Sequence, residues 1–343
     1  MDCDGQVKAV LVGCGGIANS WLKPLTLFSD CKIVGLVDIK KDNAARKRDE
    51  FNLKDAGVFE TLGEALAVTR PDVVFNLTIP AAHMVVTVEA LSNGCHVLGE
   101  KPMANSIEEA RRMIKAAKKA GKICAIVQNR RYMDGIIRFS DMLQSGVIGE
   151  LTTLNADFYI GAHCGGFQNE MEHPLLLDMA IHSFDQARFI SGKDPVSVYC
   201  VEWNPNGSWY KHGASAMAIF EMTDGLIFNY RGSWCAEGVN TSWECSWRAA
   251  GSGGSAIWDG GTDMKAERPA RREGVISPLT EISIPLAGPI ENSRHAGVIR
   301  EFLDCVRNGG EPQTVCHENI KSLAMVHSAI KSAATSRKVT IKF

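Results

Sequence analysis

In the first third of the chain, short apolar runs alternate with segments of helical periodicity. The apolar runs have the length of buried strands and cover residues 7–12, 33–37, 72–77, 96–99 and 123–127. Helical patterns lie over about 82–91 and, after a capping box formed by Ser106 and Glu109, from 107 to near Gly121. Strands that alternate with helices predict a parallel sheet with crossover helices. We therefore expect a doubly wound α/β domain over residues 1–128.

The pattern changes from Leu151 onward, where β-rich runs follow one another without helices between most of them. These runs cover residues 151–160, 196–201, 216–221, 226–233, 246–250 and 282–284. Helical patterns occur over about 174–190, 298–306 and 318–336. Consecutive strands without crossover helices favour an antiparallel sheet with one covered face. We expect an α+β domain over residues 129–343 that provides the substrate site and the subunit contacts.

A glycine-rich turn follows the first expected strand and contains Gly13, Gly15, Gly16, Ile17 and Ala18. In a strand-turn-helix unit the first glycine permits a tight turn, and the second lets the backbone approach a pyrophosphate. A small third residue, here Ala18, lets the helix pack closely, and the helix N-terminus attracts phosphate. The second expected strand ends in Asp38, where a carboxylate meets the ribose hydroxyls of adenosine. Together these features predict a Rossmann fold that binds a dinucleotide.

Two loops at the carboxyl edge of the expected parallel sheet contain polar residues, namely Thr78, Pro80, His83, Glu100 and Lys101. Ligands bind at this edge of open α/β sheets, so we expect these residues beside the nicotinamide half of the cofactor. A lysine there can hold a substrate hydroxyl and stabilise the alkoxide that develops as hydride departs. Two plainer interpretations stay open. In the first, Pro80 and His83 only begin the next helix. In the second, Glu100 forms an ordinary surface ion pair with Lys101.

The helical segment 174–190 contains acidic residues and a histidine at helical spacing. An α-helix places Asp178, His182 and Asp185 on one stripe among apolar side chains. Because an aspartate fixes the tautomer of a neighbouring imidazole and raises its basicity, this stripe suits proton transfer. The alternatives are a solvated face or a purely structural aspartate-histidine pair, and Asp185 could form a surface ion pair with Arg188.

Candidate metal ligands are His163, Cys164, His173, Asp178 and His182, but their spacing matches no zinc signature. We therefore expect no metal site. The eleven cysteines include no Cys-x-x-Cys pair, which indicates reduced thiols, and Cys14 is interpreted as a small residue that fits the glycine-rich turn.

The charge of the chain limits its partners. The 343 residues have a formal net charge of -2 and no long basic block, so nucleic acid and anionic membranes are poor partners. No apolar stretch reaches the roughly 20 residues of a membrane span, and the first residues lack the features of a signal peptide. We expect a cytoplasmic protein.

The motifs together resemble the Gfo/Idh/MocA family, the glucose-fructose oxidoreductase and inositol dehydrogenase group of sugar and polyol oxidoreductases. The resemblance rests on the glycine-rich turn, Asp38, Glu100-Lys101-Pro102 and the segment 177–182, and segments 250–255 and 328–333 resemble the family's closing pattern. It covers nearly the whole chain. It implies a Rossmann doubly wound parallel sheet followed by an α+β domain with a large, mostly antiparallel open sheet, which is often the oligomer interface.

The resemblance also implies roles for the catalytic residues. His182 takes the proton of the substrate hydroxyl while hydride passes to C4 of the nicotinamide, Lys101 orients the same oxygen, and Asp178 supports the base. Many relatives have glycines just before this helix, where this chain has Glu172-His173-Pro174. We therefore expect His173 to contact the substrate as well.

Asp38 favours NAD, because a carboxylate accepts ribose hydroxyls and repels a 2′-phosphate. Lys40 and Lys41 lie close enough to leave NADP as an alternative. We expect an NAD-dependent dehydrogenase acting on a sugar, cyclitol or glycoside, assembled as a homodimer or homotetramer through the C-terminal sheet. Two alternatives stay open: a glycosidase that transiently oxidises its sugar with tightly held NAD, and a non-enzymatic sugar sensor. A sensor does not need Lys101, Asp178 and His182 together.

Overall fold

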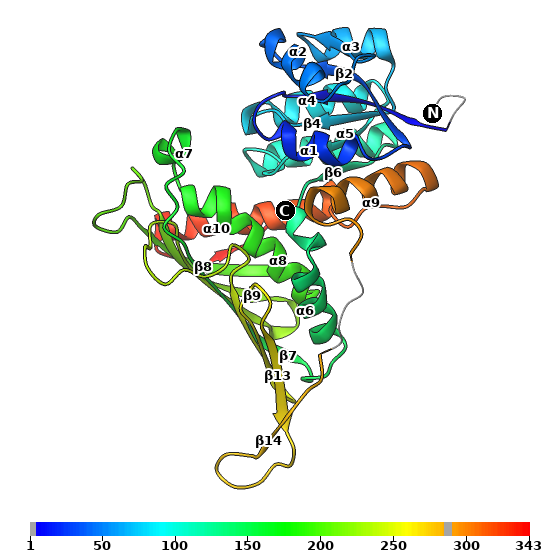
Figure 1. The fold of residues 1–343 in the computed structure, drawn as a ribbon. Coiled ribbons are helices and arrows are strands. Elements are labelled where there is room, and N and C mark those ends of the chain that lie inside the picture. The colour runs from blue at the N-terminus through cyan, green and yellow to red at the C-terminus, as the bar shows by residue number, and fades with distance from the viewer. Residues whose placement is uncertain (1–4, 285–289) are drawn as a thin grey trace. The chain divides into compact units, whose positions relative to one another are not determined.

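The computed structural model describes residues 5–284 and 290–343, which divide into two compact units (Figure 1). The first unit comprises residues 1–132 and 291–323, and the second comprises residues 133–290 and 324–343. The division between these units falls at 132/133, near the domain boundary expected at 128/129. Segment 291–323, which we expected in the second domain, belongs to the first unit.

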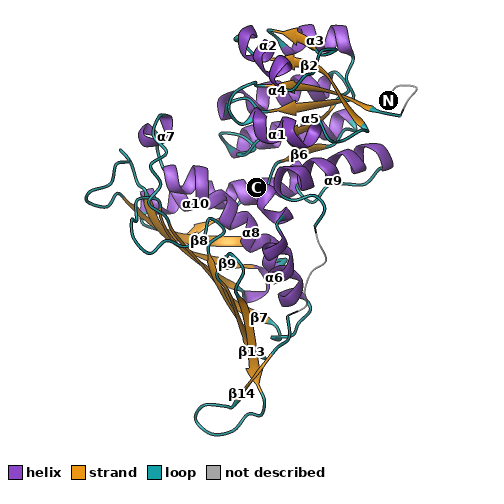
Figure 2. Ribbon diagram, viewed as in Figure 1, coloured by secondary structure: helices purple, strands orange, loops and turns teal. Residues whose placement is uncertain are grey.

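The described part of the first unit contains a six-stranded parallel sheet with the order β3-β2-β1-β4-β5-β6. Its strands are β1 (Val7–Val12), β2 (Cys31–Val37), β3 (Gly57–Phe59), β4 (Val73–Asn76), β5 (His96–Gly99) and β6 (Cys124–Ile126). Helices α1 (Ala18–Leu25), α2 (Lys41–Glu50), α3 (Leu62–Thr69), α4 (Pro80–Ser92) and α5 (Ile107–Ala120) connect them and pack around the sheet (Figure 2). This strand order is that of a doubly wound dinucleotide-binding fold, which confirms the predicted fold class.

Helix α5 illustrates how local sequence sets an element. The Ser106 side chain accepts a hydrogen bond from the backbone N–H of Glu109, and the Glu109 carboxylate accepts one from the backbone N–H of Asn105. Gly121 ends the helix in the left-handed conformation with φ of +63°. The capping box and the terminal glycine therefore fix both ends of α5.

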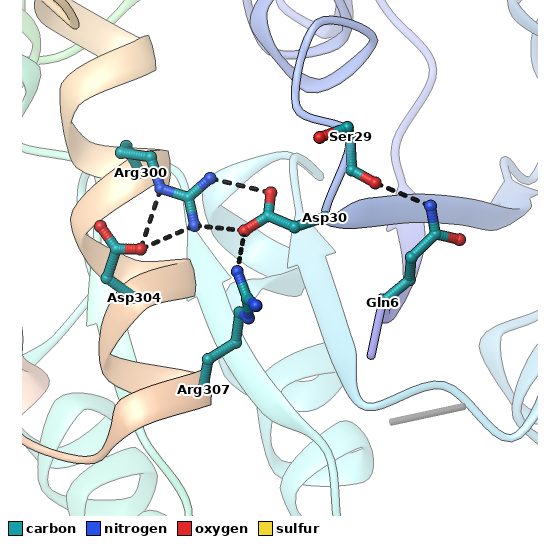
Figure 3. A network of polar contacts seen from close by, with 6 residues as sticks. All are labelled: Gln6, Ser29, Asp30, Arg300, Asp304 and Arg307. Carbon is teal, nitrogen blue, oxygen red and sulfur yellow. Dashed lines mark hydrogen bonds and ion pairs between the residues drawn. The ribbon is translucent and has the colours of Figure 1, made fainter. Parts of the chain in front are cut away.

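Helix α9 (Arg294–Asn308) joins the first unit through a charged cluster at the start of β2 (Figure 3). The Arg300 guanidinium donates to both carboxylate oxygens of Asp30, at 2.9 and 2.8 Å, and also to Asp304. Arg307 donates to the same Asp30 carboxylate. Phe302 of α9 is fully buried in the core of this unit, where its ring lies 6.3 Å from that of Phe75. These contacts between distant segments explain why α9 folds with the first unit.

The second unit contains a nine-stranded sheet among its described residues, with the order β14-β13-β12-β11-β7-β10-β9-β8-β15. The strands are β7 (Leu151–Tyr159), β8 (Pro195–Trp203), β9 (Ser215–Met222), β10 (Ile227–Ser233), β11 (Ser246–Gly251), β12 (Ser255–Trp258), β13 (Met264–Pro269), β14 (Leu279–Glu281) and β15 (Val339–Thr340). Only β7 and β10 pair in parallel, which confirms the mostly antiparallel sheet.

One predicted strand is displaced. The run 282–284 is not a strand, because β14 pairs with β13 only over Leu279–Glu281. A single further hydrogen bond, from the backbone N–H of Ile282 to the carbonyl of Ala266, follows that pairing. The apolar run 282–284 therefore begins where the pairing of β14 with β13 ends.

Helices cover one face of the large sheet (Figure 2). They are α6 (Asp134–Gln144), α8 (Ile181–Ser191) and the later part of α10 (Cys316–Thr335). Along β9, buried and exposed side chains alternate. Ala216 and Ala218 are buried, whereas Met217 and Ile219 are about half exposed, at 46% and 51%. The second face of the sheet is thus partly apolar and open.

None of the helices among the described residues has the length and the apolar composition that crossing a bilayer requires.

Candidate active site

The glycine-rich turn between β1 and α1 leaves part of its backbone open. Gly13 has φ of +96°, and a side-chain carbon there would lie 2.4 Å from the carbonyl oxygen of Leu77. At Gly15 and Gly16, no atom of the described residues other than the chain neighbours lies within 4 Å of the position of such a carbon. Packing of the chain therefore requires glycine at position 13. Gly15 and Gly16 instead leave room for close approach of a pyrophosphate.

The N-terminus of α1 follows this turn directly. Ala18, the first residue of the helix, is fully buried, and Ile17 before it provides no side-chain cap. The first turn of α1 contains no acidic residue. No side chain of the helix neutralises the partial positive charge at this end, which suits a phosphate group.

Asp38 at the end of β2 is fixed by three hydrogen bonds. Its carboxylate accepts from the backbone N–H of Cys14 at 2.8 Å, from that of Lys40 at 2.8 Å, and from the Asn43 side chain at 3.2 Å. Because an ionised carboxylate can accept about four hydrogen bonds, capacity for a ribose hydroxyl remains. The turn, α1 and Asp38 thus fit the phosphates and ribose of a dinucleotide.

Cys14 connects the glycine-rich turn to β2. Its backbone N–H donates to Asp38, its thiol lies 3.6 Å from the carbonyl oxygen of Val37, and its side chain is fully buried. Burial, together with the nearby Asp38, raises the pKa of this thiol to about 12. Cys14 is therefore a protonated, inert packing residue at neutral pH.

The loop after β4 is held by side chains within it. Asn76 accepts a hydrogen bond from the Thr78 hydroxyl at 2.7 Å and donates to the carbonyl oxygen of His83 at 3.0 Å. Pro80 is the first residue of α4, as the plainer interpretation expects. The buried His83 ring lies 2.9 Å from the carbonyl oxygen of Thr78 and 2.7 Å from that of Pro102. His83 therefore connects the loop after β4 to the loop that contains Lys101.

Glu100 is buried and fixed by several donors, which excludes the surface ion pair considered above. One carboxylate oxygen accepts a hydrogen bond from the indole N–H of Trp21 at 2.7 Å and lies 3.6 Å from Nε2 of His295. The other accepts from the backbone N–H of Lys101 at 3.2 Å. Burial would raise the pKa of Glu100, but the His295 and Trp21 contacts outweigh this effect and lower it. Glu100 is therefore ionised at neutral pH next to Lys101.

His295 and Asn129, which no sequence pattern indicates, extend this cluster. His295 lies on α9, near the other end of the chain from Trp21, and its Nδ1 is 3.3 Å from the Asn129 side chain. No local pattern around His295 indicates this contact. Only the packing of α9 on the first unit brings His295 to Glu100.

In the second unit, the helix expected over 174–190 is present but begins with a different geometry. Residues Leu175–Ala180 form a π-helix that continues into α8. Asp178 lies in the π-helical part and is partly exposed, whereas His182 lies in the first turn of α8 and is 8% exposed. Asp178 therefore belongs to a wider helical turn than the regular α-helix that the sequence pattern predicts, and its role beside His182 stays a prediction. Short π-helical segments are frequent at functional sites.

Asp185 and Arg188 do not form a surface ion pair, because both side chains are buried, at 1% and 7% exposure. Arg188 donates to Asp194 at 3.1 Å. The face of α8 that contains Asp185 therefore packs inside the second unit.

His173 precedes this helix and contacts a residue of the large sheet. Its Nδ1 lies 2.5 Å from a carboxylate oxygen of Glu202 on β8. The hydrogen bond to Glu202 raises the pKa of His173 above its ordinary value, although partial burial acts in the opposite direction. His173 keeps about a third of its side chain exposed, which is compatible with a ligand contact.

The candidate residues fall into two groups, one in each unit. The cofactor residues and Lys101 belong to the first unit, and His173, Asp178 and His182 belong to the second. Within the described residues, no group of three or more His, Cys, Asp and Glu side chains is arranged to hold a metal ion.

Comparisons with known proteins agree with this architecture. The model of an oxidoreductase family with an NAD-binding Rossmann fold matches residues 7–128, and the model of the GFO/IDH/MocA C-terminal domain matches residues 136–257. An oxidoreductase from Agrobacterium radiobacter, solved in complex with NAD+, L-tartaric acid and magnesium, superposes with a TM-score of 0.87. It is 22% identical in sequence, and the match covers 98% of both chains.

Two curated relatives also match along nearly the whole chain. The 1,5-anhydro-D-fructose reductase of Ensifer adhaerens is 23% identical, covering 97% of this chain and 98% of its own. The D-apiose dehydrogenase of Paraburkholderia graminis is 24% identical, covering 98% of this chain and 90% of its own. Together with the family models for both domains, these matches show that the chain belongs to the Gfo/Idh/MocA family of oxidoreductases with an NAD-binding Rossmann fold.

Proposed function

We propose that the protein is an NAD-dependent dehydrogenase that oxidises a hydroxyl group of a sugar, cyclitol or glycoside. The observation that carries this proposal is the sheet edge of the first unit. There, an open glycine-rich turn after β1 and a lysine after β5 share the carboxyl edge of one parallel sheet, and a buried, ionised Glu100 precedes that lysine. The relatives that act on anhydrofructose and apiose support a sugar as the substrate class.

Each cofactor residue has a distinct task in this proposal. Bound NAD supplies the hydride acceptor. The pyrophosphate is held by Gly15, Gly16 and the residues Ile17 and Ala18 at the start of α1, close to the turn formed by Gly13. Asp38 binds the adenosine ribose. Thr78 and Pro80 line the nicotinamide side of the sheet edge, where His83 and Glu100 hold the loops in place.

The catalytic roles follow from the chemistry of three side chains. Lys101 binds the oxygen of the substrate hydroxyl and stabilises the negative charge that develops on it. His182 accepts the hydroxyl proton, and Asp178 favours the protonated imidazole that results. His173 binds a further substrate group.

NADH formation with a panel of monosaccharides, inositols and glycosides tests this function. We expect stoichiometric reduction of NAD with at least one member of the panel. Cleavage of a glycoside without net NADH formation would instead support a glycosidase, and sugar binding without any turnover would support a sensor. Either outcome would contradict the proposed dehydrogenase.

We also propose that the open face of the large sheet is a contact between two copies of the chain. On this face, the alternating residues Tyr199, Val201, Met217 and Ile219 of β8 and β9 are 42–51% exposed. Apolar side chains gathered on one sheet face lose contact with water when a second sheet covers them. Light scattering of the purified protein tests the assembly, and Ile219→Lys is expected to shift it toward the monomer.

A further inference from the structure

A buried acidic side chain beside His173 lacks a donor for one of its oxygens. The Glu202 side chain is 8% exposed, and its Oε2 lies 2.5 Å from Nδ1 of His173. Its Oε1 is buried and has no hydrogen-bond partner among the described residues. Burying a carboxylate oxygen without a hydrogen-bond donor destabilises the protein. A ligand that donates a hydrogen bond to this atom would remove that destabilisation.

The chain packs closely around the Glu202 carboxylate. The turn at 211–213 lies against this side chain: a side-chain carbon at Gly213 would be 2.7 Å from the Glu202 carboxyl carbon and 3.1 Å from Oε1. Glycine at position 213 therefore lets the backbone lie against the Glu202 carboxylate, where a larger residue would displace this side chain. Asn169, whose carbonyl oxygen accepts a hydrogen bond from the backbone N–H of Lys211, has a second buried acceptor without a partner, its side-chain Oδ1.

The backbone at His173 is in a rarely populated conformation. Its φ is +52°, in the left-handed region that is uncommon for a residue with a side chain. Such a conformation persists where surrounding contacts hold it, and it is often found at binding sites. Here the contacts are the Glu202 hydrogen bond and the bond from the backbone N–H of Leu177 to the His173 carbonyl oxygen. They fix His173 at the start of the helical segment that contains Asp178 and His182.

We propose that His173 and Glu202 form a specificity site that binds hydroxyl groups of a neutral polyhydroxylated substrate. Glu202 Oε1 accepts a hydrogen bond from one hydroxyl, and Nε2 of His173, the ring atom not used by Glu202, contacts a neighbouring substrate oxygen. A sugar acid has no proton to donate at its carboxylate, so this group cannot make the hydrogen bond to Glu202 Oε1. The site therefore selects neutral sugars and cyclitols over sugar acids. This inference rests on the proposed dehydrogenase function and narrows its substrate class.

Steady-state kinetics of Glu202→Gln test the site. With a neutral substrate found in the panel, we expect KM to rise about tenfold, the loss expected for one hydrogen bond to a charged group, while kcat changes little. Discrimination against the matching sugar acid, such as glucuronate against glucose, should fall by a similar factor. His173→Asn, which changes the opposite side of the pair, should also raise KM for the neutral substrate.

Glu170→Gln is the matched control. Glu170 lies on the neighbouring segment, but its side chain is 70% exposed and pairs with Lys211 at the surface. We expect Glu170→Gln to have the wild-type KM for the neutral substrate and the wild-type discrimination against the matching sugar acid. Equal KM values for Glu202→Gln and Glu170→Gln would overturn the inference while leaving the dehydrogenase function intact.

A measurement without turnover separates the two proposals. With ¹³C-labelled histidine, the His173 Cε1 resonance should move when a neutral polyol is added to the wild type in the presence of NADH. The same addition should leave this resonance unmoved in Glu202→Gln. If no hydroxyl substrate is oxidised but the resonance still moves, the proposed reaction fails and the binding site stands. An unmoved resonance in the wild type, at polyol concentrations that saturate turnover, would contradict the site.

Discussion

Glu100 accepts a hydrogen bond from the indole N–H of Trp21 at 2.7 Å, and both side chains are buried in the first unit. The bond connects α1, whose N-terminus follows the glycine-rich turn, to the residue directly before Lys101. We predict that Trp21→Phe lowers the free energy of unfolding by roughly 2–3 kcal/mol, because a buried carboxylate loses a donor. The same change should raise the pKa of Glu100. Urea unfolding at neutral pH measures the loss.

Trp243→Phe is the control for this change, because Trp243 is 48% exposed. It should change the free energy of unfolding by about 0.5 kcal/mol or less, as surface substitutions generally do. Equal effects of the two tryptophan substitutions would show that the bond to Glu100 contributes nothing specific.

The glycine-rich turn gives a second prediction, in which two glycines behave differently. Gly13→Ala should destabilise the protein by roughly 2–4 kcal/mol, because the new methyl group meets the Leu77 carbonyl oxygen and the φ of +96° suits only glycine. Gly16→Ala should leave stability nearly unchanged but weaken NAD binding about tenfold, because its methyl group enters open space meant for the pyrophosphate. Thermal unfolding and NAD titration measure the two effects. Unchanged NAD affinity in Gly16→Ala would place the pyrophosphate elsewhere.

Asp38 should decide between NAD and NADP. Asp38→Ala removes the ribose acceptor and the charge that repels a 2′-phosphate, so the ratio of kcat/KM for NAD to that for NADP should fall by about tenfold or more. Asp42→Ala, which removes an exposed carboxylate from the first turn of α2, is the control and should keep the wild-type ratio. Retained preference for NAD in Asp38→Ala would remove Asp38 from the ribose site.

His96 gives a prediction for stability against pH. Burial lowers the pKa of His96 to about 4, with a further contribution from the nearby Lys122. The neutral ring accepts a hydrogen bond from the backbone N–H of Ile123 at 3.1 Å, next to β6. The pKa of His96 in the folded protein lies below the unfolded value of about 6.5. The neutral ring therefore contributes to the free energy of unfolding above pH 6.5, and this contribution is lost as the pH falls toward 4.

We expect a loss of roughly 1–2 kcal/mol over this range, after allowance for the partial exposure of the ring to water. Urea unfolding of the wild type and of His96→Asn at several pH values measures it. The variant should lose less stability than the wild type on acidification. Parallel curves for the two proteins would exclude His96 as the titrating group.

Local sequence predicted most of the first unit. The apolar runs of β1 and β4 are buried along almost their whole length because helices cover both faces of a parallel sheet, and such runs are visible in a sequence. The capping box of α5 is equally local. The sequence did not predict strands β12 and β13. Ser255–Trp258 is short, and Met264–Pro269 contains more charged than apolar residues.

The candidate site was predicted less completely, because several of its contacts join distant segments. His295 reaches Glu100 only through the packing of α9, and Glu202 reaches His173 only through the placement of β8 in the large sheet. Neither residue lies in a recognisable motif. The π-helix that contains Asp178 also leaves no trace in the pattern of apolar positions, which resembles that of an ordinary helix.

In the proposed reaction, Lys101 and His182 act on the hydroxyl group of the bound substrate as hydride leaves for the nicotinamide. The direct measurement is NADH formation by the wild type, Lys101→Met and His182→Asn with the same sugar or polyol, alongside NAD affinity by calorimetry. We predict that both variants bind NAD as the wild type does and lose about 100-fold or more in kcat, the usual contribution of a general acid or base. Wild-type rates in either variant, or no NADH from the wild type with any hydroxyl substrate, would contradict the account.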